Sequence, residues 1–396
     1  MAVPQRLIDE ITDGDCVAFV GAGFTAPVVP EWRQLLTDLA DSEEIDAETA
    51  EGVRALIEAG SNRDLGAAAQ TIRDEMGEER FFAIMQERLA DPPLNDPMRR
   101  RLALLHGIPF RAILTTNFDG VLEGEAPNRE AYLRVLRPEH HRWWDRRFWD
   151  EERRGAAVVK LHGTVEKPDQ VVFTHRDYRR LYASPAYSTF LRSVMASTTV
   201  LYLGFSFSDA YLNELRSEIL ALLDHRGGDV PVAYAIVNDA SPAEMRYSAA
   251  HEGIHVLPVD TKGGSDYSGF DAYLAEIHDR TNPRQILARL VDGRRIVWVG
   301  EDHPGFRFLR EAAGSAGGTT SIETLDEPVE HADLTVIHHS DTRLIARFAA
   351  EGSVVVFIDA KTPSAQRRLE AIRRGAGGYA ADWPELLQEV HRILRP

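Results

Sequence analysis

The sequence predicts an α/β protein built from two domains, each with a parallel β-sheet, and three observations support this fold class. The chain has 396 residues, which is too long for one ordinary hydrophobic core. Short apolar, β-branched runs alternate with helical patterns along most of the chain, as expected for parallel sheets covered by helices on both faces. The hydrophobic and charged fractions, 44% and 27%, are those of a soluble globular protein.

The first domain is expected to span residues 1–285 as a Rossmann-like parallel sheet with an inserted helical region. Its opening strand, Cys16–Val20, stops at Gly21, and Pro30 favours a helix start. Further strands are expected at Arg111–Thr115, Ala156–Leu161, Val171–Thr174, Thr199–Leu203, Val232–Val237 and Ile254–Val259. Residues 46–106 read as several helices, with breaks at Gly60, Gly77 and Pro92–Pro93. Later helices are expected at Glu139–Arg154, Asp209–Leu223, Ser241–His251 and Tyr267–Arg280.

A second series of strands and helices begins after a boundary at residues 281–293, so the second domain is expected to span 293–396. Its strands are expected at Ile296–Val299, Ser321–Leu325, Leu334–His338, Val354–Ile358 and Gly378–Ala380. Helices fit between them at Asp341–Glu351, Ser364–Arg374 and Trp383–Leu394. Five βα units in so short a segment predict a flavodoxin-like domain.

Composition excludes several classes of protein. Cys16 is the single cysteine, so a disulfide within the chain is excluded and a zinc site made of cysteines is not expected. The net charge of −17 disfavours broad nucleic-acid binding. The polar N-terminus does not resemble a signal peptide, and the sequence offers no apolar run long enough to span a membrane. These features predict a cytoplasmic protein with no membrane contact.

The first loop has the spacing of a phosphate-binding motif. Gly21, Ala22, Gly23 and Thr25 follow a strand in the G-x-G-x-x pattern, whose bare backbone lets a pyrophosphate approach amide groups. A tight structural turn between strand and helix is the alternative interpretation.

Polar side chains follow two further strands of the first domain. Asn117 and Asp119 end the second strand, and His162 with Gly163 ends the third. Polar groups at the carboxyl ends of parallel strands point into the ligand crevice, and an imidazole there suits a general base. The alternatives are capping roles for Asn117 and Asp119 and a structural role for His162.

Two later strands end in the same way. Gly204 and Ser206 follow an apolar strand directly before a helix, where they suit phosphate or ribose oxygens, and Asn238 ends the next strand. The alternative for Gly204 and Ser206 is a helix cap.

The order of these motifs, G-A-G, then T-x-N-x-D, then H-G, then G-x-S, then a late Asn, resembles the sirtuin (Sir2) family over roughly residues 10–280. The segment Pro30-Glu31-Trp32-Arg33 is similar to the family's P-D-F-R. The resemblance implies that Gly21, Ala22, Gly23 and Thr25 bind the pyrophosphate of NAD⁺, and that Gly204, Ser206 and Asn238 hold the adenosine half. It further implies that Asp119 contacts the nicotinamide amide or its ribose, that Asn117 orients water and ribose, and that His162 is the base.

Departures from the deacetylating sirtuins point to a different branch. The four zinc-binding cysteines and the acyl-lysine-binding F-G-E segment are absent, and T-x-x-D-Y at 174–178 and G-F-S-x-S-D at 204–209 resemble the Sir2-like branch of prokaryotic antiviral systems. That resemblance implies an NAD⁺ glycohydrolase acting in abortive infection, with NAD⁺ as substrate, no other cofactor and no structural zinc. It also implies a homo-oligomer and a HerA-like ATPase as partner. A non-catalytic module that binds NAD⁺ or ADP-ribose is the alternative, and a protein deacylase the third interpretation.

The second domain resembles a degenerate response-regulator receiver in layout. An acidic pair, Glu301–Asp302, follows its first strand, but the third strand ends in His338-His339 rather than a phosphorylatable Asp. A role in assembly or sensing is therefore expected in place of phosphorylation.

Overall fold

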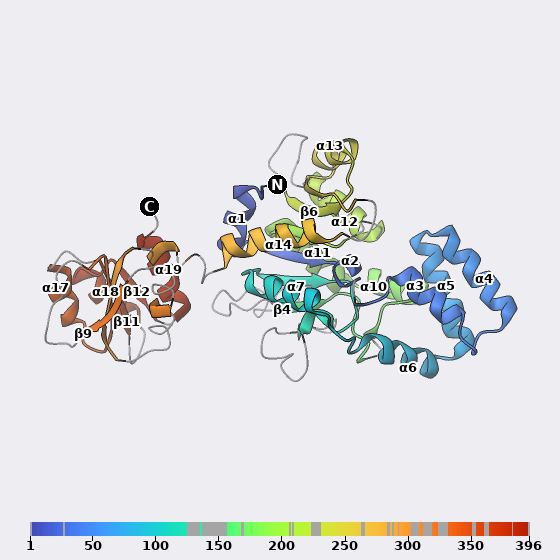
Figure 1. The fold of residues 1–396 in the computed structure, drawn as a ribbon, viewed down its shortest axis with the longest axis horizontal. Helices are drawn as coiled ribbons and strands as arrows, with labels where there is room; N and C mark the ends of the chain where they lie inside the picture. The colour runs from blue at the N-terminus through green and yellow to red at the C-terminus, as the bar shows by residue number, and fades with distance from the viewer. Residues whose placement is uncertain are drawn as a thin grey trace. The chain divides into compact units, whose positions relative to one another are not determined.

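A computed structural model of the chain (Figure 1) divides it into two compact units, Met1–His278 and Asp279–Pro396. The residues that the structure describes are 2–26, 28–124, 135–136, 157–167, 170–205, 207, 210–222, 231–262, 266–282, 286, 289–291, 293–301, 309–311, 319–323, 332–350, 354–359, 364–381 and 383–394.

The first unit is built on a parallel sheet with the strand order β3-β4-β2-β1-β5-β6-β7. Its strands are β1 (Cys16–Val20), β2 (Ala112–Thr115), β3 (Val135–Leu136), β4 (Ala157–Lys160), β5 (Thr199–Leu203), β6 (Ala233–Asn238) and β7 (Ile254–Val259). Without the two-residue edge strand β3, the order of the other six along the chain is 3-2-1-4-5-6, the doubly wound order of dinucleotide-binding sheets. The predicted Rossmann-like fold is confirmed, and the order reverses between β1 and β5.

Helices cover both faces of this sheet. The helices of the first unit are α1 (Gln5–Thr12), α2 (Ala22–Thr25), α3 (Trp32–Ala40), α4 (Ala47–Ala59), α5 (Asn62–Met76), α6 (Glu78–Leu89), α7 (Asp96–Gly107), α10 (His175–Tyr182), α11 (Pro185–Ser197), α12 (Ala210–Leu222), α13 (Pro242–His251) and α14 (Ser268–Thr281), with a 3₁₀ turn η1 at Val121–Glu123. In β1, Cys16, Ala18 and Val20 pack with α1, α7 and α14, whereas Val17 and Phe19 pack with α11 and α12 on the opposite face. Burial of both faces explains why this strand is apolar throughout.

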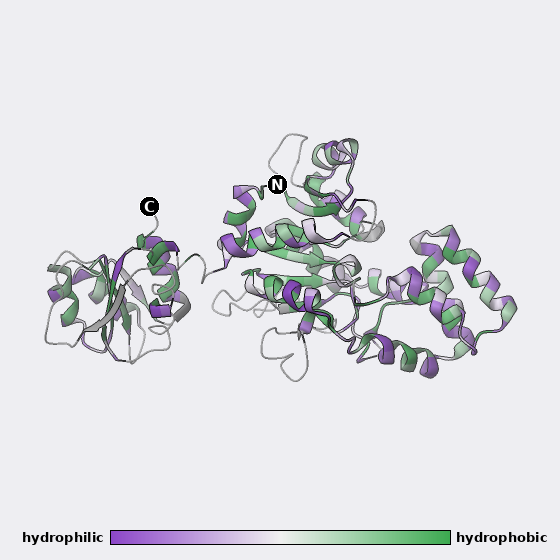
Figure 2. Ribbon diagram, viewed as in Figure 1, coloured by the Kyte–Doolittle hydropathy of each residue, from purple (hydrophilic) through white to green (hydrophobic). Residues whose placement is uncertain are grey.

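The predicted helical insertion is present as a lobe beside the sheet, made of α3 to α6 (Figure 1). Its helices break at the two expected glycines: α4 ends at Gly60, whose φ is 74°, and α5 ends at Gly77, whose φ is 81°. Figure 2 shows hydrophobic residues concentrated on the strands of the sheet, while the helices of the lobe mix hydrophobic and hydrophilic residues. This mixture fits helices that bury one stripe and expose another.

Some local predictions fail. The expected strand at Val171–Thr174 is wrong, because this segment is a loop that ends at the N-cap of α10. Helices α1, α10 and α11 were not predicted from the pattern. The charged helix expected at Glu139–Arg154 lies outside the described residues.

The second unit carries a five-stranded parallel sheet in the order β12-β11-β10-β8-β9. Its strands are β8 (Arg295–Gly300), β9 (Thr319–Glu323), β10 (Leu334–His339), β11 (Val354–Asp359) and β12 (Gly378–Ala380). One face packs against α19 (Trp383–Leu394), and the other against α17 (Arg343–Ala350) and α18 (Ala365–Arg373). Read from the opposite edge, the order is 2-1-3-4-5, which confirms the predicted flavodoxin-like topology.

Within the described part of the chain, none of the helices is both long enough and apolar enough to cross a membrane.

Candidate functional site

A cavity of about 450 Å³ opens at the carboxyl ends of the first unit's strands, where the strand order reverses. Both its position and its size are typical of small-molecule and cofactor sites. Most of the predicted site residues line it: Gly21, Ala22, Gly23, Asn117, Asp119, His162, Gly204 and Asn238. The fold thus brings together side chains that are far apart in the sequence. Ser206 lies outside the described residues.

The loops after β1 and β5 touch through their backbones. The amide of Gly21 donates to the carbonyl of Leu203 (3.0 Å), and that of Gly23 to the carbonyl of Gly204 (3.0 Å). A Cβ atom on Gly204 would lie 2.2 Å from the amide nitrogen of Phe24, and Gly204 has φ of 60°. These positions therefore need glycine for close approach of the two loops. The two amide groups tie the loops together rather than point at a phosphate.

Asn117 is held in a fixed orientation at the floor of the cavity. Its Nδ2 group donates to the carbonyl oxygen of Gly21 (3.3 Å) and to Oγ1 of Thr25 (3.2 Å), and its backbone amide donates to Oγ1 of Thr115 (3.0 Å). Because a carbonyl oxygen can only accept, the side-chain nitrogen of Asn117 must face Gly21. Its Oδ1 atom therefore points away from Gly21 and Thr25. A residue only 6% exposed with this much support is preorganised.

Thr25 lies beneath the loop instead of on the cavity wall. It is fully buried, and its hydroxyl donates to the carbonyl oxygen of Ala22 (3.3 Å) while accepting from Asn117. Thr25 is not among the residues that line the cavity. These contacts favour support of Asn117 over direct contact with a pyrophosphate.

Asp119 is a carboxylate 4% exposed at the cavity, with Oδ1 accepting from the backbone amide of Val121 (3.0 Å). Burial raises the pKa of Asp119, and the nearby Lys160 ammonium opposes that rise. A buried carboxylate of this kind suits recognition of a cationic or hydrogen-bond-donating ligand group.

His162 follows β4, is 3% exposed and lines the cavity. Its backbone carbonyl accepts from the amide of Val172 (2.8 Å). The next residue, Gly163, has φ of 80°, and a Cβ there would collide with the carbonyl of Gln170 at 2.0 Å. Glycine is therefore required at position 163 by the turn that follows His162.

Sequence reasoning missed the aromatic wall beside His162. Tyr178, on α10, meets the His162 ring edge-on with centroids 5.2 Å apart, and Trp32 stacks on both Tyr178 (6.0 Å) and Phe173 (5.3 Å). Trp32 and Tyr178 line the cavity. Both residues stood in motifs of the sequence, but only the fold brings Tyr178 to His162 and Trp32 onto Tyr178.

The T-x-x-D-Y motif has a clear local role. Thr174 and Asp177 form a capping box at the start of α10, and Arg73 of α5 pairs with the Asp177 carboxylate (3.2 Å). This pair is 13% and 10% exposed, so the motif joins the helical lobe to the helix that carries Tyr178.

Cys16 is fully buried in β1, and burial raises the pKa of its thiol, because the thiolate is disfavoured away from water. Such a thiol suits packing better than metal binding. Across the residues that the structure covers, no group of three or more His, Cys, Asp or Glu side chains is arranged to hold a metal ion.

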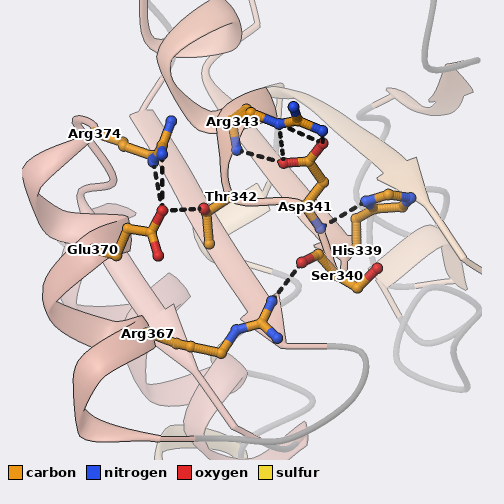
Figure 3. Close-up of polar contacts among 8 residues, drawn as sticks. All are labelled: His339, Ser340, Asp341, Thr342, Arg343, Arg367, Glu370 and Arg374. Atoms are coloured by element: carbon orange, nitrogen blue, oxygen red, sulfur yellow. Dashed lines mark hydrogen bonds and ion pairs between the residues drawn. The ribbon is translucent and has the colours of Figure 1, made fainter.

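In the second unit, the acidic groups near the carboxyl end of β10 are paired with arginines. Figure 3 shows the Asp341 carboxylate against Arg343 (2.6 Å) and the Glu370 carboxylate between Thr342 and Arg374 (both 2.8 Å). Arg343 holds the pKa of Asp341 at about 2. The side chains at the carboxyl end of β10 therefore connect this strand with α17 and α18. Asp302 of the predicted acidic pair lies outside the described residues.

Comparison with known families agrees with the motif order. The family model described as SIR2-like domain matches residues 111–257, which include the strands that carry Asn117, His162, Gly204 and Asn238. The predicted resemblance to the Sir2 family is confirmed over this stretch of the chain.

Similar proteins carry names that refer to NAD⁺ hydrolysis or to a defence-associated sirtuin. A protein of Acinetobacter baumannii (strain 532279) called NAD(+) hydrolase ThsA is 27% identical over 220 residues, covering 54% of this chain and 41% of the relative. The protein of that name from Bacillus cereus (strain MSX-D12) is 26% identical over 294 residues, covering 71% of this chain and 55% of the relative. Defense-associated sirtuin 2 of Bacillus subtilis is 23% identical over 278 residues, covering 67% and 25%. The match thus spans about half or less of each relative's length.

Proposed function

We propose that the SIR2-like domain of this chain is an NAD⁺ hydrolase that cleaves the bond between nicotinamide and ribose and acts in antiphage defence. The observation that carries the proposal is that Asn117 and His162, from different strands, line one cavity at the switch point of a dinucleotide-type sheet. The names of the similar proteins support the same activity.

The geometry suggests how NAD⁺ would lie in the cavity. Asn117, Asp119 and His162 follow β2 and β4 on one side of the switch point, whereas Gly204 and Asn238 follow β5 and β6 on the other. A dinucleotide crossing this point would place its nicotinamide ribose on the first side and its adenosine on the second. The pyrophosphate would then cross the loop at Gly21, Ala22 and Gly23.

The reaction breaks the glycosidic C–N bond, whose electron pair leaves with nicotinamide and generates an oxocarbenium-like ribosyl cation. The buried Asp119 carboxylate stabilises this positive charge, because electrostatic interactions are strong where water is excluded. The Asn117 Oδ1 orients a water molecule, and His162 accepts its proton as the water oxygen bonds to C1 of the ribose. The products are nicotinamide, ADP-ribose and one proton, with no change of oxidation state.

Incubation of the chain with NAD⁺ alone, followed by chromatography of the products, tests the proposal. Equimolar nicotinamide and ADP-ribose without an acyl-lysine peptide are expected. Binding of NAD⁺ without products would favour the regulatory module. Nicotinamide released only when an acyl-lysine peptide is present would favour the deacylase.

The cellular setting is part of the proposal. The single buried cysteine fits the cytoplasm, and the second unit offers helices α17 and α18 for contact between copies of the chain. A homo-oligomer and a HerA-like ATPase partner are proposed on the resemblance, with no metal cofactor. Light scattering of the full chain at the mass of a monomer would contradict the homo-oligomer.

A further inference from the structure

Lys160 is a charged residue that the proposed chemistry leaves unused. It is the last residue of β4, two positions before His162, and its side chain is fully buried. Its backbone lies opposite Thr115 of β2, the strand that leads into Asn117. Burying an ammonium group costs several kcal/mol unless its partners compensate, so its surroundings require an explanation.

Three oxygens surround the Lys160 ammonium. Its Nζ donates to the carbonyl oxygen of Asp119 and to that of Asn117 (3.4 Å), and pairs with Oε1 of Glu123 at 3.0 Å. An ammonium has three N–H groups, so these acceptors use its full hydrogen-bonding capacity. All three acceptors belong to the loop that carries Asn117 and Asp119 and to the 3₁₀ turn that follows it.

A gain in stability does not explain the ion pair between Glu123 and Lys160. The residue is 7% exposed, and its Oε2 atom has no hydrogen-bond partner among the described residues. A buried ion pair with an unsatisfied oxygen is a poor source of stability compared with apolar packing. Its placement directly under the loop of the candidate site is better explained by a role in that site.

We infer that Lys160 is a positioning residue for the proposed hydrolysis: it clamps the Asn117–Asp119 loop to the strand that carries His162 and places a positive charge close to Asp119. The inference rests on the proposed function.

The charges around Asp119 give the sign of the effect. Lys160 lowers the pKa of Asp119, while burial and the Glu123 carboxylate raise it. His162, Glu31, Arg33 and Tyr178 line the same cavity as Asp119. On α7, Nε2 of His106 lies 3.0 Å from the carbonyl oxygen of Leu122. Removal of Lys160 therefore raises the pKa of Asp119, and removal of Glu123 lowers it.

The test uses the full chain with Lys160→Met, Glu123→Gln and the double variant, which removes both members of the Lys160–Glu123 ion pair. Calorimetry of NAD⁺ binding from pH 5 to 9 is done in a His162→Ala background, in which the imidazole is absent and turnover is slowed. The ionised Asp119 carboxylate is the better acceptor for the nicotinamide amide or a ribose hydroxyl, so binding weakens as the pH falls through its pKa. The midpoint is expected to move up by about one to three pH units in Lys160→Met. In Glu123→Gln the midpoint is expected to stay at the wild-type pH or to move to lower pH.

Turnover supplies the second readout. With His162 intact, the double variant is expected to remain folded but to lose about 10²-fold in kcat, the scale of a misplacement of about 1 Å. A purely structural role would restore kcat in the double variant and leave the binding midpoint of a folded Lys160→Met chain at the wild-type pH, and that result would overturn the inference. A shifted midpoint in a chain whose wild-type form releases no nicotinamide would overturn the proposed function instead.

Discussion

The Nδ2 group of Asn117 donates a hydrogen bond to Oγ1 of Thr25 at 3.2 Å, which links two residues 92 positions apart in the sequence. The same amide nitrogen donates to the carbonyl oxygen of Gly21. The glycine-rich loop therefore orients the amide that is proposed to hold the attacking water. Orientation of Asn117 is thus a role of this loop that is separate from the proposed phosphate binding.

Thr25→Val should lower kcat by about fivefold, because it removes one hydrogen bond to Asn117, worth about 1 kcal/mol, with little change in side-chain volume. Thr25→Ser keeps the acceptor and should retain most of the activity. Steady-state kinetics with NAD⁺ checks both variants. A Thr25→Val enzyme with wild-type kcat would show that the bond does not orient Asn117.

Gly204→Ala should abolish activity and destabilise the first unit, since the new Cβ would meet the amide nitrogen of Phe24 at 2.2 Å in a left-handed conformation. Gly14→Ala is the matched control: Gly14 has φ of 82° but nothing within 4 Å of the added atom. We expect it to cost only the backbone strain of about 1–2 kcal/mol. Thermal unfolding with an activity assay distinguishes the two, and equal losses would contradict the close approach of the loops.

Asp177→Ala should reduce the free energy of unfolding by about 2–4 kcal/mol, because it leaves Arg73 and the amide of Thr174 without their partner in a largely buried place. Asp41→Ala removes a surface ion pair with Arg54, both side chains being 51% exposed, and should cost less than about 1 kcal/mol. Urea unfolding followed by far-UV circular dichroism measures both. A similar small change in each variant would mean that the helical lobe does not depend on this pair.

The thiol of Cys16 should resist alkylation in the folded chain at every pH up to about 9. Burial raises its pKa, so the reactive thiolate forms only above the ordinary range. Unfolding in guanidinium should make it react at the ordinary rate.

Elemental analysis should find far less than one zinc per chain; one tightly held zinc would reopen the deacylase interpretation.

Alternation of apolar runs with helical patterns was enough to predict both sheets, and the residues at the strand ends predicted eight of the residues that line the cavity. Lys160 and Tyr178 could not be recognised in this way. Lys160 looks like the polar end of a strand, and Tyr178 belongs to a short helix, HRDYRRLY, dominated by charge. Their roles depend on side chains that meet only after folding: Lys160 with Glu123, and Tyr178 with His162.

Release of nicotinamide from NAD⁺ by the wild-type chain and by two histidine variants tests the central claim most directly. His162 lines the cavity, whereas His251 lies exposed on α13. The wild-type chain and His251→Ala should release nicotinamide and ADP-ribose at equal rates, and His162→Ala should be slower by about 10²–10⁴, the usual contribution of one general base. A folded His162→Ala chain that turns over at the wild-type rate, or a wild-type chain that releases no nicotinamide, would contradict the account.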